Sequence, residues 1–337
     1  MTNLRSDSIL YLAEATIATL IDIRKTIELV DQAFAADGRK LIETFPVISH
    51  GVPKERAGWV IKSGAICGSG TEAREILGLK AGAYWPNNGS RGLANHNATM
   101  MLVDTENGCV STILGANHIT DLRTAAAGAV ASKRLAVAEP TALAIIGAGA
   151  QGHAQLEAHL CLFPDLKSIK VWNRSMAKAA AFVETWRARG ISVIQSETCC
   201  DAVEDADIIV TSTAAREPIV FADFVKPGAH ISAVGSDAAG KQELDPHLVQ
   251  ASKLFVDKRQ QSLSIGEMQR PLALGLVDES HILAELGEVC VDLHPGRTSD
   301  DEITVFDSSG VSFQDLALAE YVRREAIQRG LGQYLTR

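Results

Sequence analysis

Three glycines near the middle of the chain constrain its fold more than any other feature. Gly147, Gly149 and Gly152 directly follow the apolar run 141–146 and directly precede a segment with a helical pattern. A strand, a glycine turn and a helix in this order form the phosphate-binding part of a dinucleotide site. Gly147 permits the tight turn, Gly149 leaves space for a pyrophosphate, and Gly152 lets the helix pack closely on the strand.

The context of these glycines separates a dinucleotide site from an ordinary structural turn. The helix would begin near Ala150, so its free N–H groups and its positive end would face the phosphates. A second strand pattern, 168–173, follows that helix. The spacing alone is a weak signal because glycine-rich turns are common, but this β–α–β order favours the dinucleotide site.

The size and charge of the chain limit the classes of protein to which it can belong. Its 337 residues favour two domains, and its 46% hydrophobic and 22% charged residues suit an ordinary globular core. A formal net charge of −9 argues against nucleic acid or an anionic membrane as a partner. A small acidic ligand would then need a local basic pocket.

The cysteines and the N-terminus indicate a cytoplasmic protein without a metal site. Residues 1–7 lack the order of a signal peptide, and no apolar run has the length of a membrane span. The cysteines lack the C-x-x-C spacing of zinc sites, which favours reduced thiols. The six cysteines are Cys67, Cys109, Cys161, Cys199, Cys200 and Cys290.

The first third of the chain has the pattern of one helix followed by several strands. Apolar residues at helical spacing predict a helix over 23–38, with Asp22 as its cap and Gly38 as its end. This part is expected to be a mostly β, substrate-binding half. Its strands are expected at 45–50, 58–62, 77–85 and 99–103, with turns at 51–53, 86–89 and 106–108.

Two lysines interrupt these apolar strands, and each has two interpretations. Lys62 and Lys80 would bind a ligand if their side chains faced a cavity, whereas strand lysines more often lie on a solvated edge. His50 and His96 also have two interpretations. Such histidines are more often polar residues with hydrogen-bond partners than catalysts.

An alanine-rich segment, 117–136, predicts a long helix with Thr120 or Asp121 as its cap. Arg123 and Thr124 would then lie in its first turn, where the helix dipole disfavours a cation. A bound anion would explain an arginine at this place. A surface arginine on a long helix is the alternative.

The second half of the chain alternates helices and strands as a doubly wound domain does. A helix is expected over 176–189, with Ser175 as its cap, and strands are expected at 206–213, 228–237 and 253–257. Ligands of such sheets bind at the carboxyl ends of the strands. The segments 211–213 and 235–237 are expected at these ends.

Asp237 is the candidate proton donor or acceptor. It ends an apolar strand in a glycine-flanked turn at the expected nicotinamide crevice. A carboxylate there could exchange a proton during hydride transfer if partial burial raised its pKa. Capping of a helix near Leu244 is the alternative, although Asp245 already occupies a turn-like position.

The C-terminal segment predicts a strand and turn over 302–310 and an amphipathic helix that begins at Ser312. That helix is expected to return to the first half of the chain. We therefore expect one domain from 1–118 plus 309–337 and a dinucleotide-binding domain from 119–308.

Several longer motifs make the chain resemble the ornithine cyclodeaminase/mu-crystallin family over nearly its whole length. These motifs lie at 78–80, 118–126, 145–152, 235–245 and 302–310. The resemblance implies an α/β fold in which a Rossmann doubly wound NAD(P)-binding domain is inserted in a mostly β substrate-binding and dimerisation domain. It also implies a homodimer.

The resemblance further implies roles for individual residues. Lys80 and Arg123 would hold the carboxylate of a small substrate, and Asp237 would be the catalytic acid or base. The residues that would line the cofactor are Thr99, Arg123, Thr124, Gly147, Gly149, Ala150, Gln151, Gly152, Asn173, Arg174, Thr211, Val234, Ser236, Lys241 and Ser308.

The chain departs from the cyclodeaminases of this family in the segment 60–63. Cyclodeaminases usually carry there a glutamate that serves the basic amine of ornithine, whereas this chain has Lys62. A cation is a poor neighbour for a cationic substrate tail and suits an acidic one. Pro46 stands where the family often has an arginine, which Lys62 or Arg91 could replace, and the loop 67–74 is longer.

These departures favour the imine reductases and amino-acid dehydrogenases of the family. The expected reaction is the reduction of iminosuccinate to L-aspartate by a reduced nicotinamide, with Lys62 at the second carboxylate. An ornithine cyclodeaminase or an alanine dehydrogenase is the enzymatic alternative. A cofactor-binding protein like mu-crystallin is the alternative from another class.

The form of the cofactor has two interpretations. NAD sites usually carry an acidic residue about 20 residues after the glycine turn, but this chain has Asn173, Arg174 and Ser175 there. Arg174 could accept the 2′-phosphate of NADP. The resemblance to dicarboxylic imine reductases favours NAD, so we expect NAD and keep NADP as possible.

Overall fold

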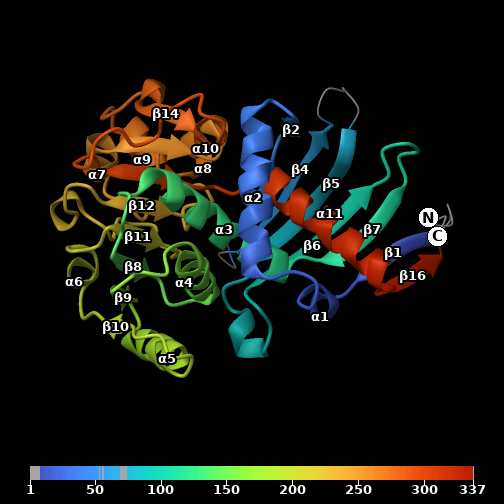
Figure 1. The fold of residues 1–337 in the computed structure, drawn as a ribbon, viewed down its shortest axis with the longest axis horizontal. Helices are drawn as coiled ribbons and strands as arrows, with labels where there is room; N and C mark the ends of the chain where they lie inside the picture. Colours follow the sequence, from blue (N-terminus) through green and yellow to red (C-terminus); the bar gives the residue numbers. More distant parts are fainter. Residues whose placement is uncertain (1–7, 53, 55–56, 69–73, 337) are drawn as a thin grey trace. The chain divides into compact units, whose positions relative to one another are not determined.

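The computed structural model describes residues 8–52, 54, 57–68 and 74–336. The chain forms two compact units, which Figure 1 shows as a ribbon: unit 1 comprises 1–123 and 311–337, and unit 2 comprises 124–310. Several expectations fall outside the described residues: the N-terminus 1–7, Pro53 in the turn 51–53, and most of the loop 67–74.

The two units divide after Arg123 and after Gly310, slightly later than the predicted domain boundaries. Contacts within each unit account for both positions. Arg123 donates from Nε to Asp315 at 3.1 Å, which keeps it in unit 1. The Gly310 N–H donates to Asp257 at 2.6 Å, which keeps it in unit 2.

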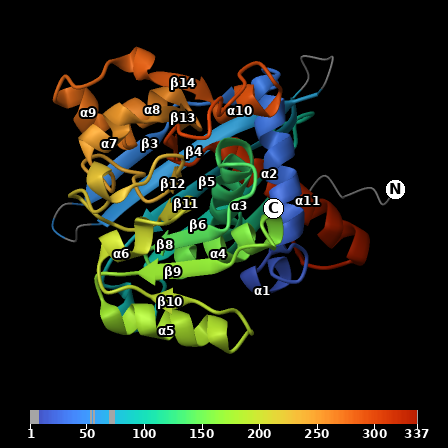
Figure 2. The same cartoon turned by 60° about the vertical axis from the view of Figure 1, so that its left-hand side comes forward.

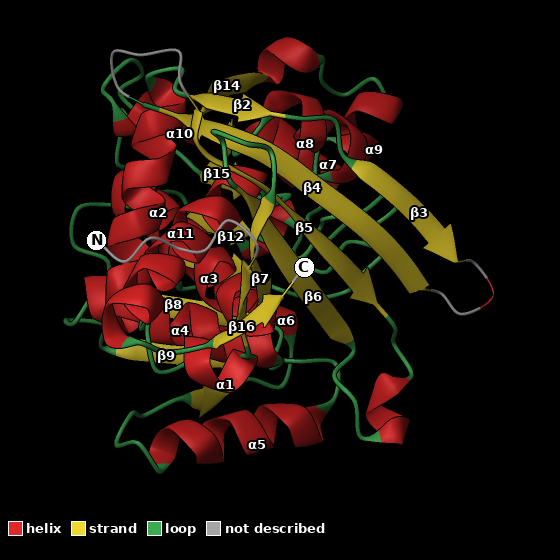
Figure 3. Cartoon of the chain, turned by 90° about the vertical axis from the view of Figure 1, so that its right-hand side faces the viewer, coloured by secondary structure: helices red, strands yellow, loops and turns green. Residues whose placement is uncertain are grey.

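Unit 1 is built on an eight-stranded sheet with the order β16-β1-β7-β6-β5-β4-β2, in which β3 also pairs with β4. Figure 3 shows β4, β5 and β6 as long neighbouring strands. The strands are β1 (Ser8–Leu12), β2 (Ile42–Thr44), β3 (Ile48–Val52), β4 (Ala57–Cys67), β5 (Arg74–Tyr84), β6 (His96–Val103), β7 (Val110–Gly115) and β16 (Gln333–Thr336).

The register of this sheet decides between the two interpretations of the lysines. Lys62 on β4 lies directly opposite Lys80 on β5, and β5 runs between β4 and β6. Lys62 is 8% exposed and Lys80 is 4% exposed. The solvated edge is therefore wrong for both lysines. The strand expected over 45–50 begins only at Ile48, the first residue of β3. The preceding segment, between β2 and β3, contains Pro46, which has no N–H to donate to a strand ladder.

Two helices pack in layers on this sheet. Helix α11 (Ser312–Arg329) lies across β4, β5 and β6, and α2 (Ile23–Gly38) packs against α11, as Figure 1 shows. Asp22 accepts a backbone N–H of α2 at 2.8 Å, which confirms the predicted cap. Gly78 permits the close approach of α11, since a Cβ there would lie 2.9 Å from Leu316. The predicted return of the C-terminal helix is confirmed.

Helix α3 (Asn117–Leu135) begins earlier than the sequence pattern predicts. Thr120 and Asp121 lie inside it and do not cap it. Arg123 and Thr124 consequently lie in its second turn rather than its first. The helix dipole acts mainly on the terminal turn, so it no longer accounts for an anion at Arg123.

The cap of α3 comes from a distant part of the chain. Glu14, the first residue of α1 (Glu14–Ile17), accepts the N–H groups of Asn117 and His118 at 2.6 and 3.1 Å. The first of these bonds joins residues 103 positions apart. A search for a nearby capping residue therefore could not place the start of this helix.

Unit 2 contains an eight-stranded sheet with the order β10-β9-β8-β11-β12-β15-β13-β14. Its described strand pairs are parallel, and the order reverses between β8 and β11, the kind of switch point at which such sheets bind ligands. The strands are β8 (Ala142–Ile146), β9 (Ser168–Trp172), β10 (Ile194–Gln195), β11 (Ile208–Thr211), β12 (His230–Ala233), β13 (Lys253–Val256), β14 (Ile282–Glu285) and β15 (Thr304–Asp307).

Both faces of this sheet are covered by helices, which confirms the doubly wound fold. Ile145 and Ile146 on β8 belong to apolar clusters on opposite faces, as do Ile209 and Val210 on β11. Figure 2 shows α5 beside β9 and β10. The helices are α4 (Ala150–Leu162), α5 (Met176–Arg187), α6 (Cys199–Val203), α7 (Pro246–Ala251), α8 (Arg259–Ile265), α9 (Gln269–Ala273) and α10 (Leu286–Cys290).

The helices and cysteines have some further features. Ser175 does precede α5, but its side chain makes no capping hydrogen bond. The six cysteines are reduced thiols, as expected. Within the described part of the chain, no helix has the length and hydropathy needed to span a bilayer. The described residues also hold no group of three or more His, Cys, Asp or Glu side chains suited to a metal ion.

Candidate functional site

The glycine turn of unit 2 has the geometry that its spacing predicts. Gly147 has a φ of +117°, a conformation that favours glycine. A Cβ at Gly152 would lie 2.0 Å from the Gly147 carbonyl oxygen, so β8 and α4 can pack closely only without it. Gly149 has no atom within 4 Å of its would-be Cβ and directly precedes α4. The space beside Gly149 and the N–H groups that begin α4 suit a phosphate group.

The end of β9 is tied to this turn. The Asn173 side chain accepts the Ala148 N–H at 3.2 Å and donates to the Ser175 carbonyl at 3.1 Å. Arg174, the next residue, is exposed. The place where NAD sites usually carry an acidic side chain is therefore occupied by a neutral amide that also holds the turn.

Glu243 joins the carboxyl ends of β11 and β12, and the sequence interpretation gave it no role. Its carboxylate accepts the Thr211 and Thr213 hydroxyls, both at 2.7 Å. It also accepts the N–H groups of Thr213 at 2.6 Å and of Gly235 at 2.9 Å. Burial raises the pKa of Glu243, and these hydrogen bonds act in the opposite direction.

The residues tied by Glu243 are neighbours of the glycine turn. Ser212, between the two threonines, lies so close to Gly147 that a Cβ on this glycine would be 2.9 Å from the Ser212 carbonyl oxygen. The predicted motif 235–245 includes Glu243, but it does not reveal the partners at 211 and 213. These contacts appear only when the strands lie side by side.

Asp237 is more exposed than expected. Its side chain is 52% exposed and forms an ion pair with Lys241. The premise of a partly buried carboxylate is therefore wrong. The alternative role as a helix cap is also wrong, because Asp245 caps α7 by accepting the His247 N–H at 3.2 Å. Asp237 is thus an accessible carboxylate on the turn that Glu243 anchors through Gly235.

The other residues expected at the cofactor are spread over both units. Thr99, which is exposed on β6, and Arg123 belong to unit 1. Ser308 donates to Asp257 at 3.2 Å, and the Ser236 hydroxyl donates to the Lys241 carbonyl at 3.1 Å. The expected residues that lie in unit 2 are Thr124, Gly147, Gly149, Ala150, Gln151, Gly152, Asn173, Arg174, Thr211, Val234, Ser236, Lys241 and Ser308.

Unit 1 brings Lys80 and Arg123 together around a buried carboxylate. Lys80 Nζ lies 2.8 Å from Asp315 Oδ1 and donates to the Thr120 hydroxyl at 3.3 Å. Arg123 Nε lies 3.1 Å from the same Asp315 oxygen. The Arg123 Nη1 donates to Gln314 at 3.3 Å. The three elements β5, α3 and α11 therefore meet at one buried ion cluster.

The charges of this cluster are coupled. Burial and the nearby Arg123 charge lower the pKa of Lys80 to about 7, although Asp315 acts in the opposite direction. Burial would raise the pKa of Asp315, but Lys80, Arg123 and Lys62 together lower it below its ordinary value. Lys80 can therefore gain or lose a proton near neutral pH when its surroundings change.

The cluster gathers cationic side chains from two strands and a helix. Lys62, Lys80 and Arg123 have little exposure, and the Asp315 carboxylate binds two of them, Lys80 and Arg123. Two cations that share one carboxylate can bind a further anion. Arg91, the other candidate cation, is exposed in a short 3₁₀ helix (Asn88–Arg91).

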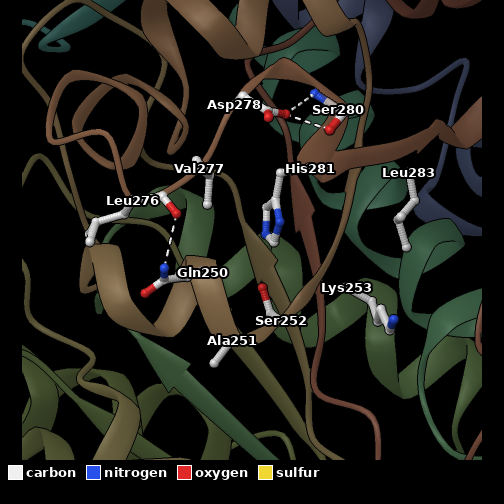
Figure 4. Close-up of a pocket in the computed structure, with 10 residues that line it drawn as sticks. All are labelled: Gln250, Ala251, Ser252, Lys253, Leu276, Val277, Asp278, Ser280, His281 and Leu283. Atoms are coloured by element: carbon white, nitrogen blue, oxygen red, sulfur yellow. Dashed lines mark hydrogen bonds between the residues drawn. The ribbon is translucent and has the colours of Figure 1, made fainter.

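A surface cleft elsewhere in unit 2 does not belong to this chemistry. Figure 4 shows it between α7 and the segment that leads into β14, with Lys253, Asp278 and His281 among its lining residues. His281 already contacts the Val249 carbonyl at 2.8 Å, and Gln250 donates to the Leu276 carbonyl at 2.9 Å. The cleft contains none of the predicted site residues.

Comparison with known proteins finds relatives that match both units of the chain. The model of the ornithine cyclodeaminase/mu-crystallin family matches residues 21–330. Iminosuccinate reductase of Paracoccus denitrificans is 38% identical over 330 residues, which cover 96% of this chain and 98% of that protein.

Two solved structures are similar over almost the whole chain. The iminosuccinate reductase of Paracoccus denitrificans in complex with NAD⁺ has a TM-score of 0.89 at 37% identity and covers 98% of this chain and 100% of its own. The Delta(1)-pyrroline-2-carboxylate reductase of Thermococcus litoralis in complex with NADH and L-proline has a TM-score of 0.91 at 30% identity. It covers 97% of this chain and 100% of its own.

The two glycines of the turn should respond differently to the same substitution. Gly152→Ala should destabilise unit 2, because its Cβ would lie 2.0 Å from the Gly147 carbonyl oxygen. Gly149→Ala should keep the stability of the wild type but weaken NADH binding, because its Cβ occupies open space beside α4. Urea unfolding and NADH fluorescence titration would measure the two effects. Unchanged NADH affinity in Gly149→Ala would contradict a phosphate site there.

Proposed function

Because the chain belongs to the ornithine cyclodeaminase/mu-crystallin family, we propose that it is an NAD-dependent reductase of a small α-imino acid. We propose further that its substrate is iminosuccinate, which it reduces to L-aspartate. Similarity to an iminosuccinate reductase and to a pyrroline-2-carboxylate reductase supports imine reduction. The choice of a dicarboxylic imine depends on the cation cluster.

The observation that carries this proposal is the gathering of three cationic side chains with little exposure in unit 1. Lys80 and Arg123 share Asp315, and Lys62 lies opposite Lys80 in the register. A substrate with two carboxylates can bind to Lys80 and Arg123 through one of them and to Lys62 through the other. The cationic tail of ornithine would instead meet Lys62, which makes a cyclodeaminase a poorer fit.

The residues of unit 2 fit a nicotinamide dinucleotide. Gly149 leaves open space beside the start of α4, and the Asn173 amide at the end of β9 holds the turn. Related structures contain NAD⁺ or NADH. Exposed Arg174 lies where it could contact the 2′-phosphate of NADP, and parallel assays with NADH and NADPH would measure the preference.

The mechanism divides the work among four side chains. Lys80 and Arg123 bind the α-carboxylate, and Lys62 binds the second carboxylate, which fixes the position of the imine carbon. The bound cofactor supplies the hydride that this carbon accepts. Asp237 donates the proton that the substrate nitrogen takes up, so that one hydride and one proton convert the C=N bond into an amine.

The family also supports a homodimer for this chain. The archaeal alanine dehydrogenase of similar fold is a dimer with bound NAD. On unit 1 of this chain, Ile48 on β3 and Trp59 on β4 are exposed large apolar side chains on neighbouring strands, and the register puts both on the same face of the sheet. We propose that this surface is covered by a second copy, because apolar patches on a protein surface often mark such interfaces.

A substrate screen tests the proposed function directly. Oxaloacetate with ammonium should give the highest kcat/KM for NADH oxidation, above pyruvate with ammonium, and the product should be L-aspartate. Parallel assays with NADPH would show whether Arg174 selects that cofactor. Conversion of ornithine to proline without net NADH oxidation would contradict the proposal and favour a cyclodeaminase.

Lys62 should discriminate between substrates with one and two carboxylates. Lys62→Met should lower kcat/KM for the four-carbon diacid imine by about 10- to 100-fold, because one charged hydrogen bond contributes about 1.5 to 3 kcal/mol. The three-carbon monoacid imine should lose much less. Arg91→Met, which removes an exposed cation, is the matched control and should leave both values unchanged. Equal losses on both imines in Lys62→Met would remove its role.

Asp237 should be needed for turnover and not for cofactor binding. Asp237→Asn should bind NADH as the wild type does, because it keeps the size of the side chain, but should lose most of its kcat, because an amide does not exchange the proton. Fluorescence titration and steady-state kinetics measure the two properties. Asp245→Asn, in the same segment, is the control. A fully active Asp237→Asn enzyme would exclude the assigned proton transfer.

A further inference from the structure

We propose that Asp315 is a positioning residue, which holds the Lys80 ammonium and the Arg123 guanidinium side by side so that both bind one substrate carboxylate. The inference rests on the proposed function, in which these two cations receive the α-carboxylate. It adds a residue from the C-terminal helix α11 to the site. Asp315 itself is not assigned a contact with the substrate.

The geometry of Asp315 brings the two cations to one point. Its Oδ1 lies 2.8 Å from Lys80 Nζ and 3.1 Å from Arg123 Nε, and its side chain is 1% exposed. The two cations come from β5 and α3, and the carboxylate comes from α11. A single buried oxygen therefore sets the separation between two like charges that would otherwise repel each other.

The donors that remain are suited to a carboxylate. An ammonium has three N–H donors and a guanidinium has five. Lys80 donates to Asp315 and Thr120, and Arg123 donates from Nε to Asp315 and from Nη1 to Gln314. Within the described part of the chain, these bonds leave one donor on Lys80 and the Nη2 donors of Arg123, which can bind a ligand without breaking any of them.

The charges around Lys80 give Asp315 a second effect. From β4, Lys62 disfavours a charged Lys80, and from α3, Arg123 does the same. On β6 the residue opposite Lys80 is the uncharged Met100. Asp315 on α11 favours the charged form, both by its charge and by its hydrogen bond. Loss of Asp315 should therefore release the Lys80 proton at a lower pH than in the wild type.

Binding of succinate separates positioning from a purely structural ion pair. Succinate is a four-carbon dianion without the reacting nitrogen, so its affinity reports on the cation cluster and requires no turnover. We would measure its Kd by calorimetry between about pH 5 and 9 and correct each value for the fraction of succinate that carries both charges. The wild-type affinity should be highest at the low end of this range and fall as Lys80 loses its proton.

Removal of the carboxylate should move this pH dependence. In Asp315→Asn the midpoint should shift to lower pH by on the order of one unit, so that succinate binds about tenfold more weakly at neutral pH. Asp315→Glu, which keeps the charge but moves it by one methylene, should have a midpoint between those of the wild type and Asp315→Asn. It carries the test alone if the asparagine variant does not fold.

The matched control lies on the same helix. Glu320 binds Arg323 and Arg324 of α11, so Glu320→Gln removes a carboxylate from the helix without touching the cluster. Its succinate profile should match that of the wild type. Urea unfolding would show whether Glu320→Gln and Asp315→Asn lose similar stability. If they do, a shift of the succinate midpoint in Asp315→Asn alone cannot come from lost stability.

Several results would overturn the inference. An unshifted midpoint in Asp315→Asn, or in Asp315→Glu if the former does not fold, would leave Asp315 with a structural role. The same conclusion would follow if the affinity fell equally at all pH values, or if the wild type did not bind succinate. Wild-type protein that binds succinate with the expected pH dependence but reduces no imine would contradict the proposed function instead.

Discussion

The buried ion cluster of Lys80, Arg123 and Asp315 is the interaction on which unit 1 depends most. A lysine on a central strand is costly to bury unless a carboxylate compensates its charge. The carboxylate comes from 235 positions further along the chain. It can reach Lys80 because α11 returns to the sheet, where Gly78 leaves room for it. The fold of unit 1 and the chemistry of its cation site therefore have the same origin.

Unit 2 stabilises its buried carboxyl groups in a different way. Glu243 and Glu267 are fully buried. Their carboxylates accept hydrogen bonds from backbone N–H groups and from uncharged side chains. Burial, together with the neighbouring carboxylates Glu243 and Asp307, raises the pKa of Glu267 well above its usual range. Burial likewise raises the pKa of Asp307 to about 8. These groups fix the loops at the carboxyl ends of the strands, whereas in unit 1 the buried carboxylate Asp315 pairs with the cations Lys80 and Arg123.

Sequence patterns predicted the parts of the fold whose determinants are local. The glycine turn, the Asp22 cap and the alternating strands and helices of unit 2 are examples. The errors arose where the partner is distant: Glu14 caps α3 from 103 positions away, and no local signal reveals this. Lys80 and Arg123 were assigned through a family resemblance, but Asp315 reads as a polar residue of an amphipathic helix. Only the folded chain shows which charges it meets.

The split of unit 1 into two segments has a consequence for biosynthesis. A ribosome finishes the whole of unit 2 before it adds α11, so the nascent chain holds Lys80 and Arg123 for some time without Asp315. Unit 2, which is continuous in sequence, can fold while the first sheet still lacks its covering helix. A premature stop codon shortly after Gly310 would therefore leave a complete parallel-sheet unit attached to an uncovered strand layer, which quality-control proteases and chaperones would recognise by its bare apolar face.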